Sequence, residues 1–144
     1  MSTNDTLQLL QVCDAGAKMA LDSIEQVLPK TKSPKLTGVL ERYRVEHRHM
    51  EQNFGDMLHE HGTIEADPSV MAQMMASMST GVKLAFDESD AKIADIVSNG
   101  CSMGIKTVTQ SINRCPAASE DSVGAAKQLI RLEESFAEEL RPYL

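Results

Sequence analysis

Apolar residues recur at heptad spacing in four long segments of the chain, and this pattern constrains the fold more than any other feature. The segments span about residues 4–29, 33–62, 82–114 and 119–142 of the 144-residue chain. Antiparallel helices that pack into a bundle show this periodicity. In no segment do apolar and polar residues alternate as they would in a strand. The sequence therefore predicts an all-α four-helix bundle that forms a single domain over residues 1–144.

Helix-ending signals fall between these segments. Ser33-Pro34 and Ser119 are typical of helix starts, because a serine caps the first turn and proline fits its first position. Gly62 is predicted to supply the left-handed residue that follows a helix, and Cys115-Pro116 to end the third helix. The predicted helices are therefore long and joined at defined points.

The connection between the second and third helices is unusually long. It runs for about 19 residues from Gly62 to Val82 and contains a predicted short helix near residues 68–79. Met71, Met74, Met75 and Met78 would share one face of that helix. A connection of this length can cross the whole bundle, so we expect the second and third helices to run parallel, as in ferritin-like bundles.

Two phrases of the sequence carry a family resemblance. The run PSVMAQMMASM at residues 68–78 and the run IADIVSNGCSMGI at residues 93–105, together with the order of the elements, resemble a bacterial branch of the ferritin-like four-helix-bundle superfamily. The resemblance covers most of the chain and implies the fold and a metal-binding ancestry. It implies no particular activity.

Composition excludes several classes of function. The net charge is −7 and the few aromatic residues are scattered, so we expect no nucleic-acid partner. The longest uncharged stretch, residues 68–82, is too short and too polar to cross a membrane. Cys13, Cys101 and Cys115 have no metal-ligand spacing and suggest no disulfide framework. These features, with no secretory signal at the N-terminus, predict a cytoplasmic protein.

The sequence lacks most of the ligands of a di-iron centre. Ferritin-like di-iron proteins use a glutamate from each of two helices and Glu-x-x-His from each of the other two. The only literal match is Glu46 to His49, and His49 falls about 140° from the apolar stripe of its helix, on the solvent side. Only His47 and Glu133 are predicted to point inward, where about six ligands are needed.

Other polar residues have simpler explanations. His59 and His61 fall in the last turn of the second helix, where a positive charge is favoured. Asp14, Lys18 and Asp22 follow i, i+4 spacing and are predicted to form a ladder on a solvent-facing side.

His47 and Glu133 are predicted to form a polar layer at the middle of the bundle. Each lies near the midpoint of its helix, level with the small residues Ala17 and Gly100. Three interpretations are open. The pair is a buried hydrogen bond that sets helix register, a mononuclear iron or zinc site completed by water or Glu46, or one wall of a small-ligand pocket for which Gly100 leaves room. Pairing would raise the pKa of His47.

The leading hypothesis is a non-enzymatic protein that acts by association, as a homo-oligomer or with a protein partner. It requires no cofactor, because no catalytic set is assembled in the sequence. The alternative is a metal-binding ferritin-like oxidoreductase or storage protein in which His47 and Glu133 hold iron or zinc.

Overall fold

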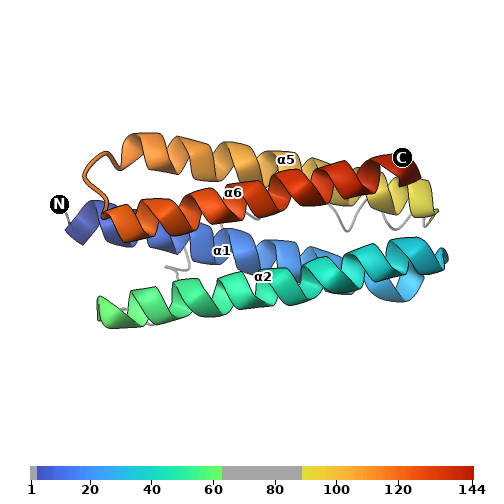
Figure 1. The fold of residues 1–144 in the computed structure, drawn as a ribbon, viewed down its shortest axis with the longest axis horizontal. Coiled ribbons are helices and arrows are strands. Elements are labelled where there is room, and N and C mark those ends of the chain that lie inside the picture. Colours follow the sequence, from blue (N-terminus) through green and yellow to red (C-terminus); the bar gives the residue numbers. More distant parts are fainter. Residues whose placement is uncertain (1–2, 63–88) are drawn as a thin grey trace.

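A computed structural model describes residues 3–62 and 89–144 of the chain. The described residues form four long helices and two short 3₁₀ helices, with no strand among them. Figure 1 shows the long helices lying side by side along one axis. The elements are α1 (Thr3–Val27), η1 (Leu28–Lys30), α2 (Pro34–Glu60), α5 (Asp90–Arg114), α6 (Glu120–Leu140) and η2 (Arg141–Tyr143). The predicted all-α four-helix bundle is confirmed.

Most helix ends lie where the sequence predicts them. The hydroxyl of Ser33 accepts a hydrogen bond from the Leu36 backbone N–H at 3.2 Å, and Pro34 is the first residue of α2. Ser119 caps α6 in the same way by accepting from the Ser122 N–H. Gly62 has a positive φ of 80° after the end of α2, a conformation that favours glycine. Cys115 follows the last residue of α5.

The start of the third long helix differs from the prediction. The heptad pattern predicted one helix from about residue 82, with Ser89 inside it. In the structure, Ser89 has extended backbone angles, and its hydroxyl accepts a hydrogen bond from the Lys92 N–H. A serine in this position satisfies an N–H of the first turn, so α5 begins at Asp90. The predicted short methionine-rich helix at 68–79 lies outside the described residues.

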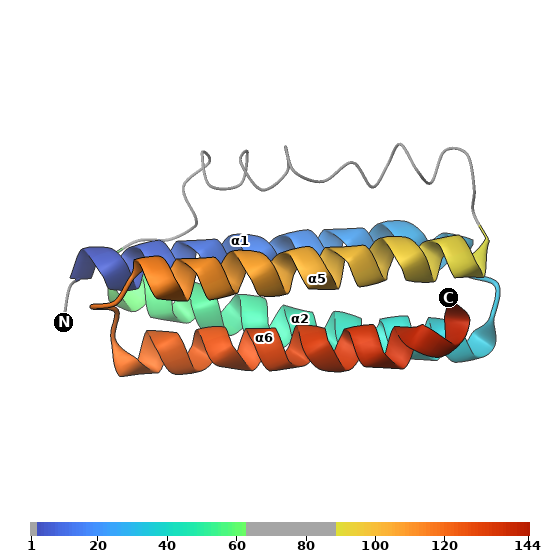
Figure 2. The same ribbon diagram turned by 90° about the horizontal axis from the view of Figure 1, so that it is seen from above.

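The directions of the helices confirm the predicted parallel pair. Figures 1 and 2 show α2 ending at the end of the bundle opposite to the one where α5 begins, so the two helices run the same way. Hydrogen bonds fix this arrangement: the Asp90 carboxylate accepts from the Lys32 and Ser33 backbone N–H groups, which places the start of α5 beside the start of α2. At the other end, Asp5 of α1 accepts from the Ala117 N–H, just before α6. Helices α1 and α2 contact one another, as do α5 and α6, α1 and α5, and α2 and α6.

The apolar core consists of two clusters, one toward each end of the bundle. One cluster includes Ile24, Leu40, Ile93, Phe136 and Leu140. The other includes Leu9, Leu10, Phe54, Val108 and Leu129. On α2 and α6 the positions that separate the two clusters are His47 and Glu133, both buried. Apolar burial therefore stabilises both ends of the bundle, and a polar pair occupies the middle.

Within residues 3–62 and 89–144, no helix combines the length and the apolar character that a membrane span requires.

Candidate functional site

A buried histidine–glutamate pair joins α2 to α6 at the middle of the bundle. His47 has no exposed surface and Glu133 is 5% exposed. The Nε2 atom of His47 is hydrogen-bonded to Oε1 of Glu133, and its Nδ1 donates to the Tyr43 carbonyl oxygen at 2.6 Å. The predicted inward position and pairing of these two residues are confirmed. Their predicted role as metal ligands stays a prediction.

The hydrogen bonds of His47 determine where its protons lie. A carbonyl oxygen only accepts, so Nδ1 must carry a hydrogen toward Tyr43. The bond between Nε2 and the carboxyl group then requires one further proton, which charges the imidazole when Glu133 is ionised. In one form of the pair, a positively charged imidazole faces the Glu133 carboxylate. In the other form, the shared proton lies on Glu133 and both side chains are neutral. Either form satisfies both buried groups.

The pKa of His47 is raised above its ordinary value of 6.5. Burial has the largest influence and acts to lower this pKa, because it penalises the charged form. The hydrogen bond and negative charge of Glu133, with the Tyr43 carbonyl, outweigh it. The environment therefore favours the charged histidine, as the sequence predicted.

The carboxyl group of Glu133 also faces α5. The Cys101 thiol lies near it, and burial followed by the negative charge of Glu133 raises the pKa of that thiol strongly. Gly104 lies one turn further along α5, where an added Cβ would be 3.8 Å from Glu133 Oε2. Glu133 is therefore shared between α2 and α5.

A cavity of about 50 Å³ lies beside Glu133, between α1, α5 and α6. Small residues leave this space, among them Gly16 and Ala20 of α1 with Gly100 and Gly104 of α5. Most of the remaining wall is apolar. The sequence-based interpretation that Gly100 makes room beside the polar layer agrees with this position, and Glu133 is the residue common to the pair and the cavity.

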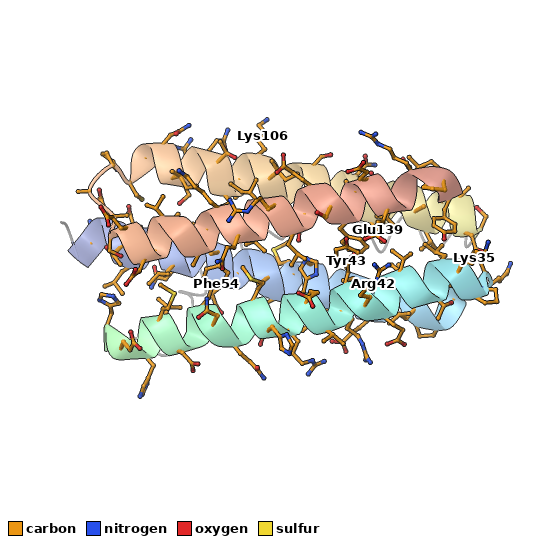
Figure 3. The ribbon with its side chains drawn as sticks, viewed as in Figure 1. Lys35, Arg42, Tyr43, Phe54, Lys106 and Glu139 are labelled. Carbon is orange, nitrogen blue, oxygen red and sulfur yellow. The ribbon has the colours of Figure 1, made fainter. Side chains whose placement is uncertain are left out.

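A second polar group on α2 and α6 was missed by the sequence analysis. Figure 3 shows Tyr43 and Arg42 of α2 directed toward Glu139 of α6. The Tyr43 hydroxyl donates to Glu139 Oε2, and the Arg42 guanidinium contacts both carboxylate oxygens, at 2.7 and 3.4 Å. The Tyr43 ring stacks on Phe136 with 4.4 Å between centroids.

This second group also shifts pKa values. Burial, followed by the hydrogen bond to Glu139, raises the pKa of Tyr43. The hydrogen bond from Tyr43, with the charge and hydrogen bond of Arg42, lowers the pKa of Glu139 below 4.5. Tyr43 lies seven residues after Leu36, at the spacing of the apolar stripe, and its hydroxyl is the sequence signal for a polar partner on another helix.

The predicted exposure of Asp14 is wrong. Asp14 is only 1% exposed and forms an ion pair with Lys18 at 3.0 Å, whereas Asp22 is exposed as predicted. Asp14 follows Cys13, and burial together with the Asp14 charge raises the pKa of that thiol to about 12. The i, i+4 spacing with Lys18 and Asp22 predicted a solvent-facing Asp14, but α1 contacts three helices, which bury more of its circumference than one stripe.

The donor set of the polar layer does not fit a closed metal centre. Within the described residues, no three His, Cys, Asp or Glu side chains are placed to hold one ion. His49 and Glu46 are exposed, and both nitrogens of His47 already have hydrogen-bond partners. A ferritin-like di-iron pair or a four-ligand zinc site needs more inward donors than His47 and Glu133 supply.

Comparison with solved structures finds this arrangement of helices in another protein. The bacterioferritin-related protein from Bacteroides fragilis, described as a dodecameric thioferritin, superposes with a TM-score of 0.78. The two chains are 14% identical, and the alignment covers 99% of this chain and 86% of that one. No family model and no curated protein matches the sequence. The chain therefore has the ferritin-like four-helix-bundle fold, as its sequence predicted.

Proposed function

We propose that this chain is the subunit of a homo-oligomeric ferritin-like protein that acts by association and has no assembled catalytic centre. The observation that carries the proposal is the polar layer at mid-bundle. Ferritin-like di-iron proteins place inward ligands on all four helices. Here the layer consists of one His47–Glu133 pair in which each group satisfies the other. Such a pair sets the register between helices without binding a substrate.

Two further observations support an assembled, non-enzymatic protein. The solved structure with the same fold is described as a dodecamer, and most soluble oligomers are closed homo-oligomers. The net charge of −7 argues against nucleic acid as the partner. We place this assembly in the cytoplasm, where the three free cysteines would stay reduced.

Native mass spectrometry and light scattering of the full chain test the assembly. We expect a mass that is an integral multiple, two or more, of the 15.8 kDa chain. A monomer mass at high micromolar concentration would contradict the proposal.

The alternative function is metal binding at His47 and Glu133, as a degenerate iron or zinc site of a storage protein or oxidoreductase. An imidazole and a carboxylate buried side by side support it, because both are ligands of these metals. Elemental analysis of the purified protein distinguishes the two. Stoichiometric iron or zinc that disappears in Glu133→Gln would favour the alternative, whereas a folded, metal-free oligomer favours association.

A further inference from the structure

The outer face of α6 carries four exposed charged side chains in a single row. They are Lys127, Arg131, Glu134 and Glu138, and we call them the α6 charge row. At about 100° per residue, their spacing of four, three and four places them within about 60° of one another around the helix. This is the side opposite to the buried Glu133 and Phe136. The first half of the row is positive and the second half is negative.

The order of these charges is unfavourable within a single chain. Lys127 and Arg131 are like charges at i, i+4 spacing, and such pairs repel on a helix surface. Glu134 and Glu138 repel in the same way, and Glu138 lies in the last turn of α6, where a positive charge is favoured. Across residues 3–62 and 89–144, none of the four belongs to an ion pair. The chain by itself therefore leaves all four charges uncompensated.

A second copy of the chain would compensate every charge in the row. The centre of the row falls between Leu132 and Glu133. When two α6 helices lie antiparallel about that point, residues at equal distances from it face each other. Lys127 then faces Glu138 of the second copy, and Arg131 faces Glu134. A parallel arrangement would instead place like charges together, which is strongly unfavourable.

We propose that the α6 charge row is a two-fold contact between two copies of this chain, with their α6 helices antiparallel. An interface of this symmetry presents the same patch on both subunits, and the patch must complement itself. The row does so, whereas a partner of one charge sign would match only half of it and meet repulsion in the other half. This inference rests on the proposed homo-oligomeric function and names one contact surface of that oligomer.

Reversing one half of the row tests the contact. Lys127→Glu with Arg131→Glu makes the whole row negative, and Glu134→Lys with Glu138→Lys makes it positive. Each double variant should weaken self-association by roughly 100-fold or more, because like charges then face each other. Sedimentation velocity over a range of protein concentrations measures this as a smaller mass than that of the wild type. Exposed charges contribute little to the stability of the chain itself, so circular dichroism should show unchanged helix content.

Two restored combinations make the test specific. An equimolar mixture of the negative and the positive variant should form mixed assemblies, because each row now finds its opposite. The fourfold variant, which exchanges both halves, keeps the net charge of the wild type and should recover self-association. Added salt should weaken the contact in the wild type, since exposed charges are screened. Failure of the mixture or of the fourfold variant to associate would overturn the proposal.

A matched control changes the net charge by the same amount at other sites. Lys35 of α2 and Lys106 of α5 are exposed and lie outside the row (Figure 3). Lys35→Glu with Lys106→Glu should leave the mass unchanged, and an equal loss of association in this variant would contradict a contact through α6. A wild-type oligomer that keeps its mass in both row variants would overturn the α6 contact and leave the proposed function standing. A monomeric wild type would overturn both.

Discussion

The two sides of this bundle are joined in opposite ways. The α2–α6 seam, formed by Arg42, Tyr43, His47, Phe136 and Glu139, is filled by large side chains that stack and hydrogen-bond across it. The α1–α5 seam, formed by Gly16, Ala20, Gly100 and Gly104, is built from small residues and borders a cavity. The four helices pack in one bundle, and the size of the side chains between them decides whether a seam is filled or borders a cavity.

Glu133 links the two seams, and this explains why they differ. One carboxylate oxygen pairs with His47 toward α2, and the other lies near Gly104 on α5. A charged residue is rarely buried without a partner, and α2 supplies the histidine that is hydrogen-bonded to Glu133. Where α5 carries glycine instead of a large side chain, space remains beside the carboxylate. Glu133 is therefore hydrogen-bonded on the side that faces α2 and borders a cavity on the side that faces α5.

The largest effect is expected when the α2–α6 seam loses its aromatic residue. Phe136 is 1% exposed, stacks on Tyr43 and lies 5.7 Å from the His47 ring. Phe136→Ala should lower the free energy of unfolding by about 3–5 kcal/mol, because a large buried ring leaves a cavity. Urea denaturation measures this loss. Val45→Ala on the exposed side of α2 is the control and should cost far less. Equal losses would mean that the α2–α6 seam is not a packed interface.

The second-largest loss of stability is expected at Glu133, which lies between the two seams. Glu133→Gln keeps the size and removes the charge, so it should cost about 1–3 kcal/mol of unfolding free energy. Glu134→Gln, at an exposed position one residue away, should change almost nothing. Urea denaturation of both variants at one pH gives the comparison. Similar losses at the two positions would contradict the buried pairing.

The pH dependence of stability sharpens this test. The folded pKa of His47 lies above its ordinary value of 6.5, so its contribution to stability is complete below pH 6.5. It is lost as the pH rises through the folded pKa, because the folded protein then releases the proton. Glu133→Gln removes the main cause of this raised pKa and should flatten the decline. A decline of unchanged size in the variant would show that another group causes it.

A smaller effect is expected from the half-exposed hydrogen bonds of the same seam. Tyr43→Phe keeps the ring stacked on Phe136 and removes the hydrogen bond to Glu139, so it should cost about 1 kcal/mol. The pKa of Glu139 is lowered, so its contribution is present above about pH 4.5 and is lost as the pH falls through the folded value. Thermal melts of both proteins between acid and neutral pH check this. Arg44→Gln, which breaks only an exposed ion pair with Glu41, is the control.

The smallest change in stability is expected on the α1–α5 seam, and it is a gain instead of a loss. An added Cβ at Gly104 would meet Glu133 atoms at 3.8 and 4.0 Å, which is ordinary contact. Gly104→Ala should therefore stabilise the protein by about 0.5–1 kcal/mol, because glycine is a poor helix former. Gly124→Ala, at an exposed position in α6 with open space around it, should give a similar gain. A loss at Gly104 alone would show that this wall of the cavity has no room.

Local features of the sequence were enough to predict the architecture. Heptad spacing, the caps at Ser33 and Ser119 and the left-handed Gly62 depend on neighbours within a few residues, so they are readable along the chain. The length of the second connection predicted the parallel α2 and α5. Mid-helix positions even placed His47 opposite Glu133, because residues at the midpoints of antiparallel helices lie at one level.

Only the tertiary structure decided which faces are buried and which groups meet across helices. Asp14 is buried because α1 contacts three helices, and the contacts between Tyr43, Arg42 and Glu139 join residues about 97 positions apart. Cys101 and Glu133 lie on the wall of one cavity because α1, α5 and α6 pack together around it. Such contacts depend on how each helix is rotated about its axis, and rotation is set by the combined packing of all four helices rather than by any one segment.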